Sequence, residues 1–388
     1  MYILIIARGI PSDRYPQWGC FERDQAEAIA SLGHKVVVVS VDSRFLWHYR
    51  KIGITKTSRN NVVSYNGFWI PGAIIGLLGE TFKLFIKQKQ LQRIYKRVVA
   101  EYGKPDIICG HFSFITSIAV NIAIKNKIPL VGIEHNAIFN EENLSKRIFW
   151  ISDYTYKHTQ QIISVSRNLQ ERIKYHLGKD SIIVNNTFGD DFLDVPCAKP
   201  YKNLIKFVAT GNLIYRKGYD LLIRAFKELD LPKELWELNI IGDGEEEQNL
   251  SLQIKNANLQ DNIFLLGRKN KSEIVDLLTQ SNFFMMPSRN ENFSVAILEA
   301  LACGLPIIAS DCGGVRDCIN SSNGIIFPVD NVEELKNAIL QIYENKLFFD
   351  NKSIAEQCKN QFGPKVIARQ LTDVFEKVVE EYKQKQLK

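Results

Sequence analysis

The sequence predicts an α/β protein with two domains, each built on a mostly parallel sheet covered by helices. Short apolar runs that read as buried strands alternate with helical patterns in residues 1–190, and the alternation restarts in residues 200–363. A segment with two prolines and few apolar residues, 194–203, separates these two parts. Glycine or polar residues follow most of the apolar runs, as they do at the ends of strands in open α/β sheets.

The composition is that of a folded protein, with 45% hydrophobic and 24% charged residues in a chain of 388. The seven cysteines are scattered without a C-x-x-C pair. This argues for a reducing compartment and against a disulfide framework or a zinc site. The N-terminal apolar run lacks a preceding basic region, and no stretch approaches the ~18 apolar residues of a membrane span. We therefore expect a cytoplasmic protein.

The net charge of +6 is distributed unevenly. Residues 1–188 carry 25 Lys and Arg against 14 Asp and Glu, whereas residues 189–388 carry 24 against 29. A basic half suggests an anionic partner, and on charge alone either nucleic acid or an anionic membrane surface fits. Because no nucleic-acid-binding motif is present, we expect no nucleic acid partner.

The first domain is expected to begin with a strand, a long turn that contains Gly19, and a helix. A G-x-G-x-x-G fingerprint for dinucleotides is absent. His111 and His135 follow two later strands, at the edge where open α/β sheets bind ligands, which makes both candidate site residues. The predicted elements are strand Tyr2–Ala7, helix Phe21–Leu32, and strands Val36–Val41, Asp106–Cys109, Ile128–Ile133 and Ile162–Val165.

Residues 81–102 read as a basic amphipathic helix, and an apolar run at 68–78 precedes it. Two interpretations remain open. The run can be core and the helix can carry an ordinary solvated face, or the region 68–97 can dock on an anionic membrane surface. The cations of the helix are Lys83, Lys87, Lys89, Arg93, Lys96 and Arg97.

The second domain shows the same alternation, and residues 364–388 read as a final helix. Gly211 and Gly267 follow two of its strands. The predicted strands are Leu204–Ala209, Leu238–Ile241, Ile263–Leu266, Phe283–Met286 and Ile307–Ala309.

The stretch from Pro287 to Ser310 combines two carboxylates with a helix N-terminus. A polar turn precedes a helical pattern, for which Ser294 is a plausible N-cap and Gly304 a plausible C′ residue. Glu291 lies before the helix and Glu299 within it. The backbone N–H groups between them favour an anion, so the stretch suits a nucleoside diphosphate sugar, whose hydroxyls take carboxylates and whose phosphates take N–H groups.

This stretch resembles the signature of retaining GT-B glycosyltransferases of family 4, also called group 1, written E-G-F-G…E-A-x-A-x-G-x-P. The matching residues run from Glu291 to Ser294 and from Glu299 to Pro306, with Asn292 and Ser294 replacing the two family glycines. The resemblance covers nearly the whole chain and is weakest at 42–104. It implies two Rossmann-like domains facing across a cleft. Residues 1–190 with the returning helix 364–388 would be on the acceptor side, and residues 200–363 would bind the nucleotide sugar.

The resemblance also assigns roles. It places Glu299 on the ribose, Glu291 on the transferred sugar, and the N–H groups of Phe293 and Ser294 on the diphosphate. His135 matches the histidine that contacts the donor sugar. Further donor-binding candidates are Gly19, Gly211, Asn212, Gly267, Arg268, Asn292 and Val295.

The stretch 211–218 matches the family pattern G-R-L…K-G. Lys217 matches the lysine that contacts the diphosphate, but Asn212 stands where the arginine usually is. We expect Arg216 to supply the missing charge. Growing negative charge on the β-phosphate makes such cations the main source of rate enhancement.

The resemblance implies a retaining glycosyltransferase (EC 2.4) that needs no cofactor and no protein nucleophile. Because no D-x-D motif is present, we expect no metal requirement. The expected donor is a UDP- or GDP-linked sugar, and the expected acceptor is a lipid-linked glycan in cell-surface polysaccharide or glycolipid biosynthesis. The enzyme would work in the cytoplasm, on the inner face of the membrane.

Two alternatives remain open. A GT-B sugar-nucleotide epimerase would bind the same donor but would need acid/base groups beyond His135. A non-catalytic sugar-nucleotide-binding partner of another transferase would fit the replacements Asn212, Asn292 and Ser294. The sequence leaves the sugar, the base, the acceptor and the oligomeric state undetermined.

Overall fold

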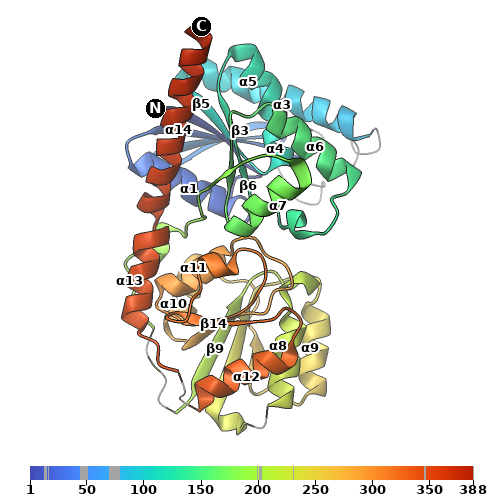
Figure 1. Ribbon diagram of the computed structural model, residues 1–388, viewed down its shortest axis with the longest axis vertical. Helices are drawn as coiled ribbons and strands as arrows, with labels where there is room; N and C mark the ends of the chain where they lie inside the picture. The colour runs from blue at the N-terminus through green and yellow to red at the C-terminus, as the bar shows by residue number, and fades with distance from the viewer. Residues whose placement is uncertain are drawn as a thin grey trace. The chain divides into compact units, whose positions relative to one another are not determined.

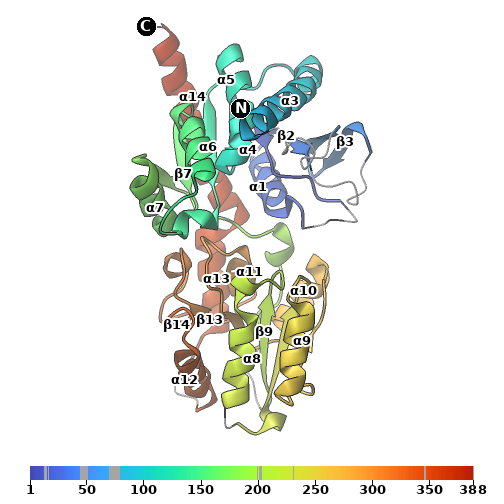
Figure 2. The same cartoon turned by 90° about the vertical axis from the view of Figure 1, so that its right-hand side faces the viewer.

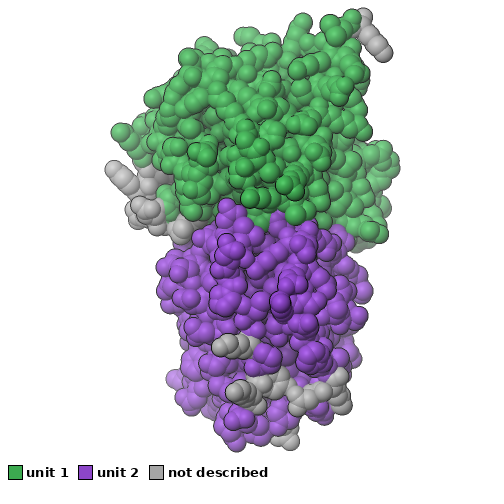
Figure 3. Space-filling view, turned by 90° about the vertical axis from the view of Figure 1, so that its left-hand side faces the viewer, with its two compact units in different colours: residues 1–185, 364–388 green, residues 186–363 purple. Residues whose placement is uncertain are grey.

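The chain forms two compact units (Figure 3). Unit 1 comprises Met1–Asn185 and Pro364–Lys388, and unit 2 comprises Asn186–Gly363. The structure, a computed structural model, describes residues 1–12, 15, 17–43, 51–69, 79–198, 200, 203–229, 231–344 and 347–387.

Unit 1 contains an eight-stranded sheet with the order β3-β4-β2-β1-β5-β6-β7-β8. Its neighbouring strands are parallel except for the antiparallel pair β3 and β4. The strands are β1 (Tyr2–Ile6), β2 (Lys35–Asp42), β3 (Gly53–Arg59), β4 (Val62–Phe68), β5 (Ile107–His111), β6 (Leu130–Glu134), β7 (Gln161–Ser164) and β8 (Ile182–Ile183).

Helices cover this sheet, and the last helix of the chain packs against the first (Figure 1). Strands β1 and β6 are buried along their whole length, as expected for parallel strands covered on both faces. The helices are α1 (Cys20–Ser31), α3 (Glu80–Tyr102), α4 (Ser113–Thr116), α5 (Val120–Asn126), α6 (Lys146–Lys157), α7 (Arg167–Leu177) and α14 (Pro364–Leu387), with 3₁₀ turns η1 (Ser117–Ala119) and η2 (Ala137–Asn140).

Unit 2 contains a six-stranded parallel sheet with the order β11-β10-β9-β12-β13-β14. The strands are β9 (Ile205–Thr210), β10 (Trp236–Ile241), β11 (Ile263–Leu265), β12 (Phe283–Met286), β13 (Ile307–Ser310) and β14 (Gly324–Phe327). The helices are α8 (Tyr219–Glu228), α9 (Glu247–Asn256), α10 (Lys271–Thr279), α11 (Val295–Ala302), α12 (Val332–Tyr343) and α13 (Asn351–Phe362), with 3₁₀ turns η3 (Asp190–Phe192), η4 (Tyr215–Lys217), η5 (Lys233–Leu235) and η6 (Val315–Asp317).

The strand order of each sheet reverses direction at one point. In unit 2 this switch lies between β9 and β12, and in unit 1 it lies between β1 and β5. Loops that leave the carboxyl ends of such a strand pair diverge to opposite faces of the sheet and leave a crevice for a ligand. Most candidate residues of unit 2 follow β9 and β12, while Gly267 and Arg268 follow β11. In unit 1, Gly19 follows β1, His111 ends β5 and His135 follows β6.

The change of unit comes earlier in the chain than the proline-containing segment 194–203 that the sequence analysis chose. The reason is that the residues after β8 already contact unit 2. The Asn186 side-chain amide donates to the Phe293 carbonyl (3.0 Å), and the Thr187 hydroxyl donates to the Phe362 carbonyl (2.8 Å).

The region 42–79 differs most from expectation. Strands β3 and β4 form a hairpin that we did not predict, because β3 is largely exposed and polar and lacks an apolar pattern. Phe68, the first residue of the apolar run that the sequence left open as core or membrane surface, is buried at the end of β4. The rest of the apolar run, 70–78, lies outside the described residues. Among the described residues, no helix is both long and apolar enough to cross a bilayer.

Candidate functional site

The loop after β9 places a lysine against a glycine. Gly211 has a φ of 151°. A Cβ at this position would lie 2.9 Å from the Tyr219 hydroxyl oxygen and 3.6 Å from the Lys217 Nζ. The approach to the Tyr219 hydroxyl is closer than a Cβ tolerates, whereas the distance to the Lys217 Nζ is an ordinary contact, so Tyr219 and the positive φ together favour glycine here. Turn η4 ends at Lys217, and Gly218, with a φ of 69°, leads into α8.

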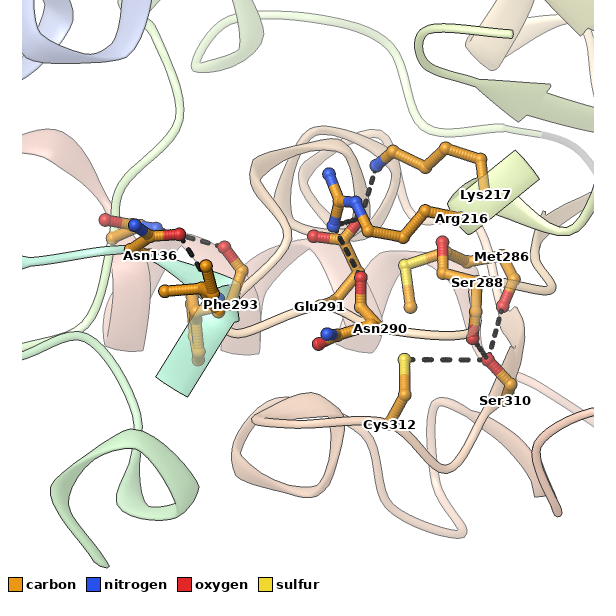
Figure 4. A network of polar contacts seen from close by, with 12 residues as sticks. Asn136, Arg216, Lys217, Met286, Ser288, Asn290, Glu291, Phe293, Ser310 and Cys312 are labelled. Carbon is orange, nitrogen blue, oxygen red and sulfur yellow. Dashed lines mark hydrogen bonds and ion pairs between the residues drawn. The ribbon is translucent and has the colours of Figure 1, made fainter. Parts of the chain in front are cut away.

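Two cations converge on one carboxylate in this loop region (Figure 4). The Lys217 Nζ donates to Glu291 Oε1, and the Arg216 guanidinium lies 3.4 Å from the same oxygen. Arg216 also donates to the Asn290 carbonyl. The structure thus brings together three residues that sequence analysis proposed as catalytic: Arg216, Lys217 and Glu291.

The charge state of Glu291 follows from two opposing effects. Burial acts to raise its pKa, since its side chain is only 12% exposed, but the charges of Lys217 and Arg216 outweigh burial. The pKa of Glu291 therefore lies below its usual value, and the carboxylate is ionised at neutral pH. Burial, together with the Glu291 charge, raises the pKa of Tyr219, so this phenol stays protonated.

A glycine loop supports the backbone of Glu291. Gly313 follows β13 with a φ of 58°, and a Cβ there would lie 1.6 Å from the Glu291 carbonyl oxygen. The neighbouring Gly314 N–H donates to the Asn292 carbonyl (2.6 Å). Only a residue without a side chain permits this approach, so Gly313 fixes where the Glu291 backbone runs.

Helix α11 begins next to Glu291. Ser294 occupies the N-cap position, as the sequence indicated, and its side chain makes no capping hydrogen bond. Val295 is the first helical residue, and Glu299 is half-buried in the second turn. The N–H groups of the first turn have no partner inside the helix, which suits this end to an anion. Phe293 is buried and packs against Phe362, with 5.6 Å between ring centroids.

The loops after β10 and β11 adjoin the loop after β9. The Leu213 N–H donates to the Asp243 carbonyl (2.8 Å), and the Gly242 N–H donates to the Gly267 carbonyl (3.0 Å). Arg268, a predicted donor-binding residue, forms a two-pronged pair with the Asp243 carboxylate at 2.8 and 2.9 Å. Sequence analysis did not select Asp243, although it stands between two glycines at a strand end.

Arg289 holds η4 in place and was also missed. Its guanidinium donates to both Asp220 oxygens (2.8 and 2.7 Å) and to Asp330 (2.7 Å), and it lies 3.9 Å from the Tyr215 ring centroid. Its own N–H donates to the Arg216 carbonyl (2.8 Å). Arg289 is therefore a positioning residue for the two cations. The sequence signal that could have identified Arg289 was its position directly before the Asn290–Asn292 turn.

In unit 1 the two candidate histidines form a pair. The His111 Nδ1 and His135 Nε2 atoms are 2.9 Å apart, and the rings stack with centroids 5.1 Å apart. Burial, with a smaller contribution from the charge of Arg8, lowers the pKa of His111 to about 3. The buried Glu134 carboxylate fixes the chain here by accepting the N–H groups of His135 (2.9 Å) and Asn136 (3.0 Å).

Close to this pair, α1 begins at Gly19. With a φ of 84°, Gly19 is the N-cap of α1, and a Cβ there would lie 2.1 Å from the Gly9 carbonyl oxygen. The Arg8 guanidinium lies 5.0 Å from the Trp18 ring centroid and 3.6 Å from the buried Glu22 carboxylate. Burial raises the pKa of Glu22. Sequence analysis missed Arg8 and Glu22, since a lone arginine after a strand carries no motif.

The predicted residues therefore form two groups. Unit 2 gathers most of them around Glu291, whereas Gly19, His111 and His135 form a group in unit 1. Asn212 is exposed, with its carbonyl accepting the Ile214 N–H (2.9 Å). In the described part of the chain, no cluster of three or more His, Cys, Asp or Glu side chains is arranged to hold a metal ion.

Comparison with known proteins agrees with this arrangement. The family described as "Glycosyl transferases group 1" matches residues 198–361, and "Glycosyltransferase Family 4" matches residues 23–186. An uncharacterised glycosyltransferase of Methanocaldococcus jannaschii is 30% identical over 308 residues, which is 70% of this chain and 75% of that protein. This chain belongs to the group 1 glycosyltransferases.

Two further relatives of the glycosyltransferase have named roles. The amylovoran biosynthesis glycosyltransferase AmsK of Erwinia amylovora is 26% identical and matches 72% of this chain and 73% of its own. A phosphatidylinositol N-acetylglucosaminyltransferase of Arabidopsis thaliana is 23% identical and matches 84% of this chain and 72% of its own.

Solved structures show the fold of the glycosyltransferase to be GT-B. Sucrose-phosphate synthase from Thermosynechococcus elongatus superimposes with a TM-score of 0.80 at 17% identity, covering 98% of this chain and 99% of that one. Anabaena HepE in complex with UDP and glucose gives a TM-score of 0.74 at 18% identity, covering 97% of this chain and all of the other.

Proposed function

We propose that this glycosyltransferase transfers a sugar from a nucleoside diphosphate sugar to a lipid-linked glycan acceptor, with retention of the anomeric configuration. The single observation that carries the proposal is the convergence of Lys217 and Arg216 on Glu291 beside the α11 N-terminus. This arrangement offers cations and N–H groups to a diphosphate and a carboxylate to sugar hydroxyls.

In the proposed reaction, the bond between the anomeric carbon and the β-phosphate oxygen breaks. The bond from the acceptor oxygen to the same carbon forms on the same face, and the acceptor proton passes to the departing phosphate. Negative charge grows on the β-phosphate, where Lys217 and Arg216 lower the barrier. Glu291 holds the transferred sugar, Glu299 holds the ribose, and His135 contacts the sugar.

Both cations pair with Glu291, which offsets the cost of burying the carboxylate. When the donor binds, its phosphate oxygens become new acceptors for the same N–H groups. The Glu291 carboxylate then gains sugar hydroxyls as donors and remains ionised. The exchange avoids leaving a buried charge uncompensated.

The acceptor and setting rest on the named relatives. One relative acts in amylovoran biosynthesis and another is a phosphatidylinositol N-acetylglucosaminyltransferase, so polysaccharide and glycolipid pathways both occur among them. HepE was solved with UDP and glucose, which supports a UDP-linked donor, with a GDP-linked donor as the alternative. We propose that the enzyme works on the cytoplasmic face of the membrane without a metal ion, which predicts unchanged activity in excess EDTA.

A panel of nucleoside diphosphates in a thermal-shift assay tests the donor. A ligand at 100 times its dissociation constant adds ~2.7 kcal/mol to the free energy of unfolding. Product analysis then tests the reaction class. A transferase slowly hydrolyses its donor to free nucleoside diphosphate, an epimerase yields a new sugar nucleotide, and a binding partner leaves the donor unchanged.

Two substitutions separate the carboxylate roles. Glu299→Ala should weaken binding of the free nucleoside diphosphate, because Glu299 holds the ribose. Glu291→Ala should mainly lower turnover of the sugar donor, and Glu247→Ala, an exposed carboxylate on α9, is the matched control. Calorimetric titration and donor hydrolysis measure both effects. Equal loss of nucleoside diphosphate affinity in the first two variants would contradict the assignment.

A further inference from the structure

Four large aromatic side chains of unit 1 are exposed on α3 and α6. The exposed fractions are 43% for Phe82, 48% for Phe85, 46% for Phe149 and 40% for Trp150. Other apolar side chains of α3 turn inward, and the buried ones include Leu84, Leu91, Ile94 and Val98. Exposed aromatic side chains gathered on neighbouring elements mark an interaction surface.

The two helices that carry these side chains are neighbours in unit 1. Both pack against η1, and they lie next to each other in Figures 1 and 2. Their N-terminal ends are joined by an ion pair between Arg147 and Glu80, at 3.0 Å. The aromatic side chains flank this joint, since Phe82 and Phe85 lie in the first two turns of α3, and Phe149 and Trp150 lie in the first two turns of α6.

This face is also strongly basic. Over the length of α3, six Lys and Arg stand against the two acidic residues Glu80 and Glu101, and over α6 three stand against Asp153. Lys89 lies 5.3 Å from the Phe85 ring centroid, so cation and aromatic ring share the same surface. The exposed cations of the two helices are Lys89, Arg93, Lys96, Arg97, Lys146, Arg147 and Lys157.

The pKa of Lys87, on α3, is affected by the neighbouring positive charges. Lys87 is largely buried, and its pKa is lowered to about 8, first by burial and then by the charge of Lys83; Arg147 adds to the effect, while Glu80 opposes it. Positive charges that lower the pKa of a neighbouring lysine are stabilised when an anionic surface approaches them.

We propose that the aromatic–basic face, formed by the exposed residues of α3 and α6, docks unit 1 on an anionic lipid bilayer. Aromatic rings with cations beside them suit the bilayer interface, where the rings enter the headgroup region and the cations meet lipid phosphates. The occupant is an anionic bilayer and not an isolated acidic protein, because aromatic side chains and cations are exposed together on both helices, which suits the headgroup region of a bilayer.

This face overlaps the region 68–97 that the sequence suggested, because its α3 residues lie within that region, but it departs from it in two respects. Phe68 is core, whereas α6, which the sequence analysis left out, contributes two of the four aromatic side chains. The inference deepens the proposed function, because a lipid-linked acceptor lies at the bilayer surface. The bilayer contact is tested without donor or acceptor. A protein that transfers sugar but does not bind vesicles would contradict only the bilayer contact, and a protein that binds vesicles but does not transfer sugar would contradict only the proposed function.

Flotation of the full chain tests the proposal. The vesicles contain phosphatidylcholine alone or phosphatidylcholine mixed with phosphatidylglycerol. We expect flotation with the anionic vesicles only, and at least a tenfold loss in high salt, because the attraction fades within a Debye length. Brominated lipids should quench Trp150 fluorescence, measured as the difference between the wild type and Trp150→Phe.

Matched variants locate the surface. Phe82→Ser with Phe85→Ser should reduce flotation at least tenfold, whereas Ile124→Ser with Tyr175→Ser, which removes exposed apolar residues of α5 and α7, should not. Flotation should be abolished by the double charge reversal Lys89→Glu with Arg93→Glu on α3. It should be unchanged by the control double reversal Lys365→Glu with Lys377→Glu on α14. An unchanged midpoint of thermal unfolding shows that each variant is folded.

Three outcomes would overturn the proposal. The first is wild-type behaviour of both α3 variants in flotation. The second is binding to neutral and anionic vesicles alike. The third is self-association in solution, seen by sedimentation as a dimer that Phe82→Ser with Phe85→Ser dissociates, since the face would then be covered by a second copy.

Discussion

Lys217 and Arg216 both pair with the carboxylate of Glu291. Substitution of either cation is therefore expected to affect transfer. Each cation lies close to Glu291, and only Lys217 lies over Gly211. Asn212, which replaces the family arginine, is exposed and uncharged. In the proposed reaction, the two cations offered to the diphosphate are therefore adjacent residues of one 3₁₀ turn.

At this scale we predict that Lys217→Ala lowers kcat/KM for transfer by ~10²-fold or more, the usual effect of losing a preorganised contact to developing charge. Arg216→Ala should also be damaging, because no cation stands at position 212. Arg224→Ala, an exposed arginine of α8, serves as the control. Steady-state kinetics measure all three. An Arg216→Ala enzyme with an unaltered rate would show that the missing charge comes from elsewhere.

The buried histidine pair predicts a pH dependence of stability. The pKa of His111 falls from an ordinary value of 6.5 to about 3 on folding. Between these values the unfolded chain binds a proton that the folded chain does not, so stability is complete above pH 6.5 and declines as the pH falls towards 3. The decline should reach about 1.4 kcal/mol per pH unit.

Chemical denaturation at pH ~7.5, ~5.5 and ~5 measures this slope. His111→Gln should have a shallower slope, while His158→Gln, at the half-buried residue that follows α6, should keep the wild-type slope. Identical slopes for the wild type and His111→Gln would show that His111 is protonated in the folded state.

At the scale of elements, the strongest patterns predicted the structure well. The helices expected at 21–32 and 81–102 appear as α1 and α3, with bounds shifted by one residue at most. Their apolar spacing follows directly from the helical repeat. The hairpin of β3 and β4 was missed, because an exposed edge strand needs no apolar alternation to pair with its neighbour.

The loop after β13 offers a test of how elements position the site. We predict that Gly313→Ala lowers stability and weakens nucleoside diphosphate binding, since its Cβ would collide with the Glu291 carbonyl oxygen. Gly178→Ala, at the end of α7, has a similar φ of 63° but open space around it, so it should cost only the roughly 1–2 kcal/mol of the left-handed conformation. Thermal unfolding and nucleotide titration compare the two. Equal stability losses with intact binding would mean that the loop shifts without moving Glu291.

At the scale of the whole molecule, each unit has its own core and its own switch point in strand order. The chain enters unit 2 at Asn186 and returns to unit 1 with α14, which packs on α1. The excess of basic residues lies in the part of the chain that forms most of unit 1. The proposed bilayer contact and the proposed diphosphate site thus belong to different units.

The sequence by itself determined the α/β alternation, the GT-B family and the residues Lys217, Arg216 and Glu291. These depend on local patterns: apolar periodicity, glycines at strand ends, and a motif within one stretch of chain. Tertiary structure alone decided the partners of these residues. The support of Arg289 by Asp220 and Asp330, and the pairing of His111 with His135, join residues distant in sequence. The grouping of Phe82 and Phe85 with Phe149 and Trp150 likewise arises only when α3 and α6 pack on η1, because a contact across the fold leaves no trace in local spacing.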